Sequence, residues 1–456
     1  MSNKYDNYLK YSLIVSAVVA GILLLLYFIP GSVIEMLNLR RIDILSDIKR
    51  NPIDGHEDEI SNNAEEDSPT EKEIPEIPCK EGMVCFEDYS ENKDGLLLFY
   101  RALNNKGKRP VRIAFYGDSY IEGDIFVGDL RALLQEKFGG AGIGFVGATS
   151  ITAGFRQTIK HSFGGWKNYH LTDTGKKDYS KMGMAGSYHL PGKNAWVKFA
   201  GVDKHLLDIF KTVKLIYSTS SKINFSYKIN NEESVAAQLT PTDKGIGYLE
   251  IKDDSIAQIR FSFPESDVII YGASIERDNG VIVDNFSLRG TPGTAIQAIP
   301  TENLKKFDSI LNYDLIVLQY GLNVMSPKQT NYKVYQRNMV NAINHIKQSF
   351  PETSILLLSV GDRSMRKDGQ YVTMPCVEPM VAAQREMCIE TKIVFWNLFE
   401  AMGGKGSMVK FVNSKPAKAN KDYTHLNFEG GKYLGDLLFN TIMFDKQRYD
   451  ARFFGK

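Results

Sequence analysis

Short apolar runs alternate with amphipathic helical patterns through the second half of the chain. These runs are apolar, which is typical of strands that are buried on both faces of a sheet. Between the runs, apolar residues recur every three or four positions, as in Met339, Ala342, Ile343 and Ile346, and this spacing predicts helices. These runs lie at 315–318, 355–358 and 393–396, and the helical patterns at about 335–350, 381–388 and 429–442. A similar run, apolar apart from Arg112, lies earlier in the chain, at 111–116. The alternation predicts a parallel sheet that is covered by helices on both faces.

A Gly-Asp-Ser tripeptide follows the first apolar run. Gly117 lets the chain turn after the predicted strand, and a helical pattern from 126 to 138 comes after Ser119. A strand, a turn and a helix in this order carry Ser119 to the carboxyl edge of the sheet, where open α/β folds bind their ligands. The N–H groups at the start of a helix can hold an anion there. Ser119 is therefore a candidate nucleophile.

Two later segments supply the other groups that a serine nucleophile needs. Asn323 follows the run at 315–318, and Asp422 and His425 come just before the last predicted helix. His425 can take the proton of the Ser119 hydroxyl, which is a poor nucleophile without a neighbouring base. Asp422 can fix the tautomer of His425 and stabilise its charged form. The Asn323 amide and the Ser119 backbone N–H are candidate donors to the oxyanion, and losing one such donor costs roughly 100- to 1000-fold in rate.

Each segment also has a simpler explanation when it is taken alone. A Gly-Asp-Ser tripeptide occurs by chance in many proteins, Asn323 suits an ordinary turn, and Asp422 suits the N-cap of a helix. The favoured interpretation rests on the combination, because all three segments come at the expected ends of predicted elements. Together they indicate a catalytic site.

The order and setting of these segments resemble the SGNH (GDSL-type) hydrolases. The superfamily is named for its serine nucleophile, its oxyanion-hole glycine and asparagine, and its histidine base. Segment 116–124, followed by Leu130-Arg131, 138–140 and 142–145, is similar to the opening block of bacterial peptidoglycan O-acetylesterases. In those proteins a β-rich, carbohydrate-binding-like domain is inserted after that block. Ser119 lies 204 positions before Asn323, so the resemblance implies a serine esterase with such an insertion.

The chain departs from the family pattern at two positions. Tyr120 follows the nucleophile, where related enzymes often have His or Leu. In the second block the family pattern places the oxyanion glycine first in a G-x-x-G, whereas here Ser287 takes the first position and Gly290 the second. Because a backbone N–H suffices for that role, the resemblance still implies Ser287 as the third oxyanion donor.

The region between residues 151 and 274 has a different pattern. Apolar and polar residues alternate strictly at 223–229 and 259–263, which predicts strands with one buried face. Several such segments, separated by turn residues, predict an antiparallel β-sandwich. The resemblance implies that this sandwich is carbohydrate-binding-like. Trp166 and Trp196 either stack on sugar rings or belong to the core of the sandwich.

The N-terminal part of the chain predicts an anchor and a tether. Residues 11–30 are almost wholly apolar and uncharged, long enough for one transmembrane helix, and a cleavable signal peptide is the alternative. Residues 50–78 contain ten Asp or Glu and four prolines, which predicts an extended, self-repelling linker. Counting charges on the two sides of the span does not fix its orientation. The functional interpretation places the rest of the chain outside the cytoplasm.

Composition excludes some partners. A net charge of +1 gives no electrostatic basis for binding nucleic acid. The seven histidines show no metal-ligand pattern, and no phosphate-binding loop is present, so we expect neither metal nor cofactor. Cys79 with Cys85 and Cys376 with Cys388 predict either two local disulfides or buried free thiols. The sequence does not indicate an oligomeric state.

These inferences combine into one predicted architecture of class α/β. It is an SGNH-type (flavodoxin-like) parallel sheet in a three-layer sandwich, with an inserted antiparallel β-sandwich and an N-terminal transmembrane helix. The expected boundaries are 1–31 for the anchor, 32–94 for the linker and lead-in, 95–150 and 275–456 for the catalytic domain, and 151–274 for the insertion.

The expected function is that of a membrane-anchored esterase which removes acetyl groups from an envelope glycan. The resemblance favours peptidoglycan as the substrate, whereas the residues themselves do not distinguish it from acetylated xylan. The expected location is the inner membrane, with the catalytic domain in the periplasm. Two alternatives remain: an O-acetyltransferase that uses the same machinery, and a non-catalytic anchor that binds glycan.

Overall fold

The computed structural model describes residues 77–455, except 106, 108, 205, 243, 244, 278 and 454. The chain divides into two compact units, Met1–Lys72 and Glu73–Lys456, and all described residues belong to the second. The predicted anchor at 1–31 and most of the predicted linker at 32–94 lie outside the described residues. Within the described part, no helix is both long enough and apolar enough to cross a membrane.

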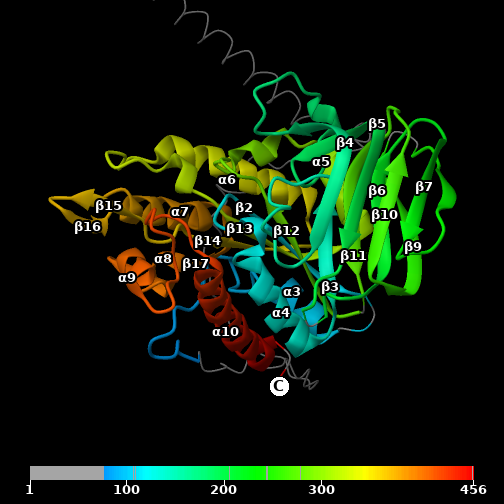
Figure 1. The fold of residues 1–456 in the computed structure, drawn as a ribbon. Coiled ribbons are helices and arrows are strands. Elements are labelled where there is room, and N and C mark those ends of the chain that lie inside the picture. Colours follow the sequence, from blue (N-terminus) through cyan, green and yellow to red (C-terminus); the bar gives the residue numbers. More distant parts are fainter. Residues whose placement is uncertain are drawn as a thin grey trace, which may run out of the picture. The chain divides into compact units, whose positions relative to one another are not determined.

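A six-stranded sheet forms one half of the described unit (Figure 1). Its order is β1-β17-β14-β13-β2-β12; β1 is antiparallel to β17, and the other neighbours are parallel. The strands are β1 Glu87–Asp88, β2 Val111–Gly117, β12 Val281–Ser287, β13 Tyr313–Gln319, β14 Ser354–Leu358 and β17 Val394–Trp396. The predicted parallel sheet is therefore confirmed, and its carboxyl edge carries the segments that follow β2, β12 and β13.

Helices cover both faces of this sheet (Figure 1). Helices α3, α4 and α10 lie on one face, and α5, α6 and α7 lie on the other. The helices are α3 Leu97–Asn104, α4 Val127–Phe138, α5 Thr301–Leu311, α6 Lys333–Ser349, α7 Val377–Thr391, α8 Leu398–Ala401, α9 Ser407–Asn413 and α10 Phe428–Phe453. The last helix extends well beyond the predicted end near residue 442, because Tyr449 packs edge-on against Tyr100 and its hydroxyl donates to Asp88 at 2.7 Å.

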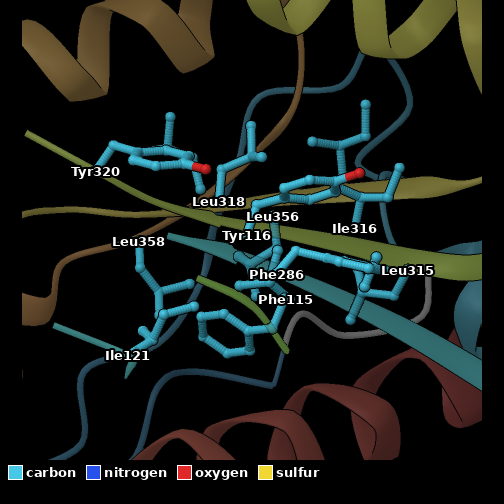
Figure 2. Packing of buried hydrophobic residues seen from close by; sticks show 14 of the residues in the cluster. Phe115, Tyr116, Ile121, Phe286, Leu315, Ile316, Leu318, Tyr320, Leu356 and Leu358 are labelled. Atoms are coloured by element: carbon cyan, nitrogen blue, oxygen red, sulfur yellow. The ribbon is translucent and has the colours of Figure 1, made fainter. Parts of the chain in front are cut away.

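The apolar runs of the sequence form the core between the helices and the sheet (Figure 2). Ile316 and Leu318 lie on the side of α6 and α7, whereas Phe115 lies on the side of α10. All three side chains are almost completely buried. Burying one such side chain stabilises the fold by about 1.5–3 kcal/mol. The continuous apolar character of these strands therefore follows from burial on both faces.

A nine-stranded antiparallel sheet forms the other half. Its strands are β3 Gly142–Gly147, β4 Lys160–His170, β5 Ser187–Ala200, β6 Phe210–Ser218, β7 Ile223–Ile229, β8 Val235–Leu239, β9 Gly247–Ile256, β10 Gln258–Phe263 and β11 Ile269–Glu276. The alternating segments at 223–229 and 259–263 are strands β7 and β10, as predicted. Phe199, Phe261 and Leu215 belong to a second apolar core within this sheet. Strand β3 pairs with β11 and also contacts β12, so the antiparallel sheet lies beside the edge strand of the parallel sheet.

The two tryptophans of the antiparallel sheet, Trp166 and Trp196, are partly engaged by neighbouring residues. The Trp166 indole N–H donates to the Trp196 carbonyl oxygen at 2.8 Å, and its ring packs against Phe263. The Arg260 guanidinium lies over the Trp196 ring at 4.0 Å from the centroid. Both rings are half-buried, so the structure is compatible with either predicted role.

One of the two expected disulfides is formed. Cys79 and Cys85 are bonded, with their Cα atoms 6.0 Å apart. Cys376 and Cys388 are free and buried, which is the second of the two predicted alternatives. Cys376 caps the start of α7 and Cys388 lies near its end, about 18 Å away at 1.5 Å per residue. A disulfide requires Cα atoms within about 7 Å, which one helix cannot provide at this spacing.

Candidate active site

Ser119 lies in a tight turn at the carboxyl end of β2. The last residue of the strand, Gly117, pairs with Ser287 of β12 on one side and with Gln319 of β13 on the other. A Cβ atom at Gly117 would lie 2.9 Å from the Gln319 carbonyl oxygen, so only glycine fits here. A short 3-10 turn, η1 (Glu122–Asp124), separates Ser119 from α4. The sequence predicted that the N–H groups next to the serine belong to the start of an α-helix. In the structure they belong to the turn that precedes α4.

Ser119, His425 and Asp422 form a hydrogen-bonded series. The Ser119 Oγ lies 3.1 Å from His425 Nε2, and His425 Nδ1 lies 2.7 Å from Asp422 Oδ2. Asp422 Oδ1 also accepts hydrogen bonds from the backbone N–H groups of Thr424 and His425. Burial raises the pKa of Asp422, but the hydrogen bonds from His425 and Thr424 outweigh it and hold the pKa below its usual value. An ionised Asp422 can orient the ring so that Nε2 faces the serine.

The loop that carries His425 is fixed by contacts that the sequence did not reveal. The Arg363 Nε donates to Thr424 Oγ1 at 3.2 Å, and its Nη1 donates to the Leu322 carbonyl oxygen at 3.4 Å. The Tyr423 ring stacks on Tyr371 of β16 (Gln370–Thr373), with the centroids 3.6 Å apart. Arg363 thus joins the His425 loop to the turn that contains Asn323. No motif marked Arg363, because its role depends on two loops that are distant in the sequence.

Asn323 lies in the 3-10 turn η4 (Leu322–Val324) after β13, at the same edge of the sheet as Ser119. Its Nδ2 donates to Asp118 Oδ2 at 3.0 Å and to the Thr291 carbonyl oxygen at 3.1 Å. Both amide hydrogens therefore have acceptors in this structure. The amide can serve an oxyanion only by sharing or exchanging one of these bonds.

Ser287, the other expected oxyanion donor, is the last residue of β12. Its backbone N–H donates to the Asn285 Oδ1 at 3.0 Å, so it is engaged in this structure. Asn285 in turn donates through Nδ2 to the Ile121 carbonyl oxygen at 2.9 Å. The Ser119 backbone N–H, by contrast, donates to no residue that the structure describes. Of the three expected donors, only the Ser119 N–H is free, and the oxyanion roles of Ser287 and Asn323 stay predictions.

Asp118, next to the nucleophile, is a buried carboxyl group. Burial raises its pKa from 3.8 to about 7, although the Tyr120 N–H, the charge of His425 and the Asn323 amide act in the opposite direction. Between pH 3.8 and about pH 7, Asp118 therefore keeps its proton in the folded state but has lost it in the unfolded state. By linkage, the free energy of unfolding must fall as pH rises through this window.

We therefore expect an Asp118→Asn variant to lose this part of the pH dependence. One pKa unit is worth about 1.4 kcal/mol, so the wild type should lose a few kcal/mol of stability between pH 4 and 8 that the variant retains. Chemical denaturation of both proteins at several pH values measures the difference. The pKa of Asp445 is also raised. Because Asp445 is present in both proteins, its effect on the pH dependence is the same in both and does not contribute to the difference. Parallel stability curves would show that Asp118 ionises normally.

A buried ionic cluster underlies the site. The Asp124 carboxylate accepts hydrogen bonds from Arg131 at 2.9 Å, from Arg156 at 2.8 Å and from Asn285 at 2.8 Å. Arg131 belongs to α4 and Arg156 to the segment before β4, so the cluster joins the two halves of the unit. Through Asn285 it also holds the Ile121 carbonyl and the Ser287 N–H. The sequence did not mark any of these residues as part of a cluster.

Among the described residues, no group of three or more His, Cys, Asp or Glu side chains is arranged to hold a metal ion.

Comparison of sequences finds no relative, since no protein-family model and no curated protein matches the chain. Comparison of structures does. A peptidoglycan O-acetylesterase superposes with a TM-score of 0.64 over 79% of this chain and 99% of its own, at 18% sequence identity. The two proteins share a fold. The structural resemblance to peptidoglycan O-acetylesterases that the motifs indicated is thus confirmed at the level of the fold.

A family two carbohydrate esterase from Cellvibrio japonicus also matches, over 63% of this chain and 97% of its own, with 8% identity and a TM-score of 0.26. That superposition is too loose to carry an argument. What the comparisons establish is an α/β fold with a parallel and an antiparallel sheet that resembles the fold of an esterase.

Proposed function

We propose that the chain is a serine carboxylic-ester hydrolase of SGNH type that removes O-acetyl groups from a glycan. The observation that carries the proposal is the series Ser119–His425–Asp422 at the carboxyl edge of the parallel sheet. The shared fold with a peptidoglycan O-acetylesterase supports peptidoglycan as the substrate. In this proposal the parallel sheet and its helices are the three-layer catalytic domain, and the antiparallel sheet is an inserted, carbohydrate-binding-like sandwich.

The mechanism follows from the distances. The Ser119 Oγ attacks the acetyl carbonyl carbon while His425 Nε2, 3.1 Å away, takes its proton. His425 is then an imidazolium, which Asp422 stabilises, and it protonates the sugar oxygen as the ester bond breaks. Water attacks the acetyl-enzyme with His425 again as the base, releasing acetate and restoring Ser119.

The oxyanion is held first by the Ser119 N–H, which has no other acceptor among the described residues. Asn323 becomes a second donor when one of its hydrogens turns from the Thr291 carbonyl or from Asp118 toward the substrate. The N–H of Ser287 becomes the third when it leaves Asn285. Substrate therefore exchanges existing hydrogen bonds for bonds to the developing charge, which is where donors act most strongly.

Solvent exposure favours hydrolysis over transfer of the acetyl group. The side chains of His425 and Asp422 are 39% and 48% exposed. An O-acetyltransferase that uses the same machinery must keep water from the acetyl-enzyme, and an open base does not do this. The expected membrane anchor and periplasmic location fit an enzyme that acts on an envelope glycan, and they belong to the proposal.

The test is release of acetate from two substrates. Full-length protein is incubated with O-acetylated peptidoglycan and, separately, with acetylated xylan, and free acetate is measured. We expect release from peptidoglycan that disappears in Ser119→Ala. Release from xylan alone would keep the esterase and replace the substrate. Release from neither, by a protein with a normal circular dichroism spectrum, would contradict the proposal and favour the non-catalytic alternative.

A further inference from the structure

A pocket of about 190 Å³ lies where the parallel sheet meets the antiparallel sheet. It is called the junction pocket here. Ser287 and Asn285 of the edge strand β12 line one side, and the segments 149–152 and 170–173 line the other. Figure 1 shows β12 beside β3 and β11 in this region. Ser287 pairs in register with Gly117, and Glu122 and Gly123 also line the pocket, so the pocket lies close to the turn that carries Ser119.

The walls of the junction pocket are held in place by buried partners. On the side of the antiparallel sheet, the fully buried His189 contacts Ser187 Oγ at 3.4 Å through Nε2 and Thr149 Oγ1 at 3.4 Å through Nδ1. Asn285 of β12 and Arg156 of the segment before β4 are both bonded to the buried Asp124. The polar groups that face the pocket are therefore already oriented, so little ordering is needed when a ligand binds.

The charges around the junction pocket balance. Arg289 and Glu122 form a bidentate pair at 2.8 and 2.5 Å. Asp124 carries one negative charge against the two positive charges of Arg131 and Arg156, and the exposed Asp173 on the rim supplies the other negative charge. Burial lowers the pKa of His170, a further lining residue, so its ring is neutral at pH 7. A strongly charged ligand would have to separate existing ion pairs, and the pocket therefore favours a neutral one.

The lining also combines hydroxyl groups with apolar surface. Thr149, Ser150, Thr152 and Ser287 line the pocket with hydroxyl groups. Those of Ser150 and Thr152 are bonded to each other at 2.8 Å, and that of Thr149 donates to Asn168 Oδ1 at 3.1 Å. A hydroxyl oxygen has two lone pairs, so it can accept a further hydrogen bond. Ile151, another lining residue, is 70% exposed and offers apolar contacts. Pockets for drug-sized ligands measure about 300–1000 Å³, so this one has room for part of a larger ligand. A pyranose ring, with hydroxyls at its edge and C–H groups on its faces, matches this chemistry.

We propose that the junction pocket binds one neutral sugar ring of the glycan, next to the ring whose acetyl ester reaches Ser119. The inference rests on the proposed function for the identity of the reaction, but the binding itself is independent of catalysis. It places the recognition of the polymer at the junction of the two sheets and not on the outer face of the antiparallel sheet. The pocket also contains Ser287, so an occupied pocket touches one of the expected oxyanion donors.

Thr172 provides a way to block the pocket. Its side chain is exposed and lines the pocket, whereas the equally exposed Thr174 in the same segment does not. A Thr172→Trp substitution should fill the mouth without disturbing any buried group. The Thr174→Trp substitution is the matched control, because it adds the same ring to the same loop outside the pocket.

Isothermal titration calorimetry on full-length protein measures the binding of two neutral probes, chitotetraose with N-acetylated rings and xylotetraose. We expect at least one probe to bind, with its Kd raised tenfold or more by Thr172→Trp and changed less than twofold by Thr174→Trp. Absence of binding to both probes, or equal binding by wild type and Thr172→Trp, overturns the proposal. Binding that depends on Thr172 in a protein that releases no acetate would leave the pocket standing and refute the esterase, so the two failures are distinguishable.

Discussion

Replacing His425 with alanine should lower the kcat for acetate release by about 10⁴- to 10⁶-fold, because Ser119 then has no base to accept its proton. The 3.1 Å contact between Ser119 Oγ and His425 Nε2 is the bond that the substitution removes. Ser119→Ala should have an effect of similar size. The double variant should be no slower than either single one, since the two residues act as one unit and their losses do not add.

The measurement is the initial rate of acetate release from the better substrate, at saturating concentration. The side chain of His425 is 39% exposed, so truncating it should leave the fold intact, and circular dichroism checks this. Asp422→Asn should cost less than His425→Ala, because it disturbs the orientation of the base but does not remove the base. Turnover within tenfold of wild type in His425→Ala would show that another group is the base.

Much of this site could be predicted from sequence because its positions are set by strand ends. Ser119 and Asn323 follow apolar runs that could only be buried strands, and adjacent parallel strands bring their carboxyl ends together. In the structure, Gly117 at the end of β2 is paired with Gln319 at the end of β13, so the residues that follow the two strands lie close together. The pairing of Asp422 with His425 needs only three residues of separation in one loop, so the spacing itself carries the information.

The hydrogen bonds that occupy the oxyanion donors could not be predicted in this way. Whether Asn323 donates to Asp118 or to a substrate depends on the position of a buried carboxylate from another strand end. Likewise, Asn285 accepts from Ser287 only because the other end of its amide is held by Asp124 and Ile121. Such contacts are set by tertiary packing, and no local spacing rule encodes them.

The antiparallel sheet shows a similar limit. The alternation at 223–229 and 259–263 predicted two of its strands, because each has one buried face. Strand β3, Gly142–Gly147, lacks that alternation and pairs with β11, Ile269–Glu276, more than a hundred residues later. The same limit applies to Arg131 and Arg156. An arginine in a sequence is usually expected at the surface. In the structure, however, the side chains of Arg131 and Arg156 are 1% and 9% exposed, and both are paired with the Asp124 carboxylate.

That shared carboxylate leads to the second prediction with a large effect. Asp124→Ala should lower the free energy of unfolding by about 3–5 kcal/mol, because it leaves the guanidiniums of Arg131 and Arg156 buried and unpaired. Burial opposes the charge of Asp124, but the two arginines outweigh it and hold its pKa far below the usual range. The carboxylate is therefore ionised at any pH at which the protein is folded, and its removal exposes the full cost of two buried cations.

Thermal unfolding provides the measurement, with an expected drop in midpoint on the order of 5–10 °C. The matched control is Asp436→Ala on α10, where the exposed carboxylate lies 3.3 Å from Lys432 and should contribute roughly 0.5 kcal/mol or less. The unfolding midpoint of Asp124→Asn should lie between those of Asp124→Ala and Asp436→Ala. The asparagine removes the charge but keeps one oxygen that can accept a hydrogen bond from one of the arginines. If Asp124→Ala unfolds at the same temperature as the control, water must reach the two guanidiniums. In that case the cluster could not hold Asn285, and through it Ser287, in a fixed position beside the nucleophile.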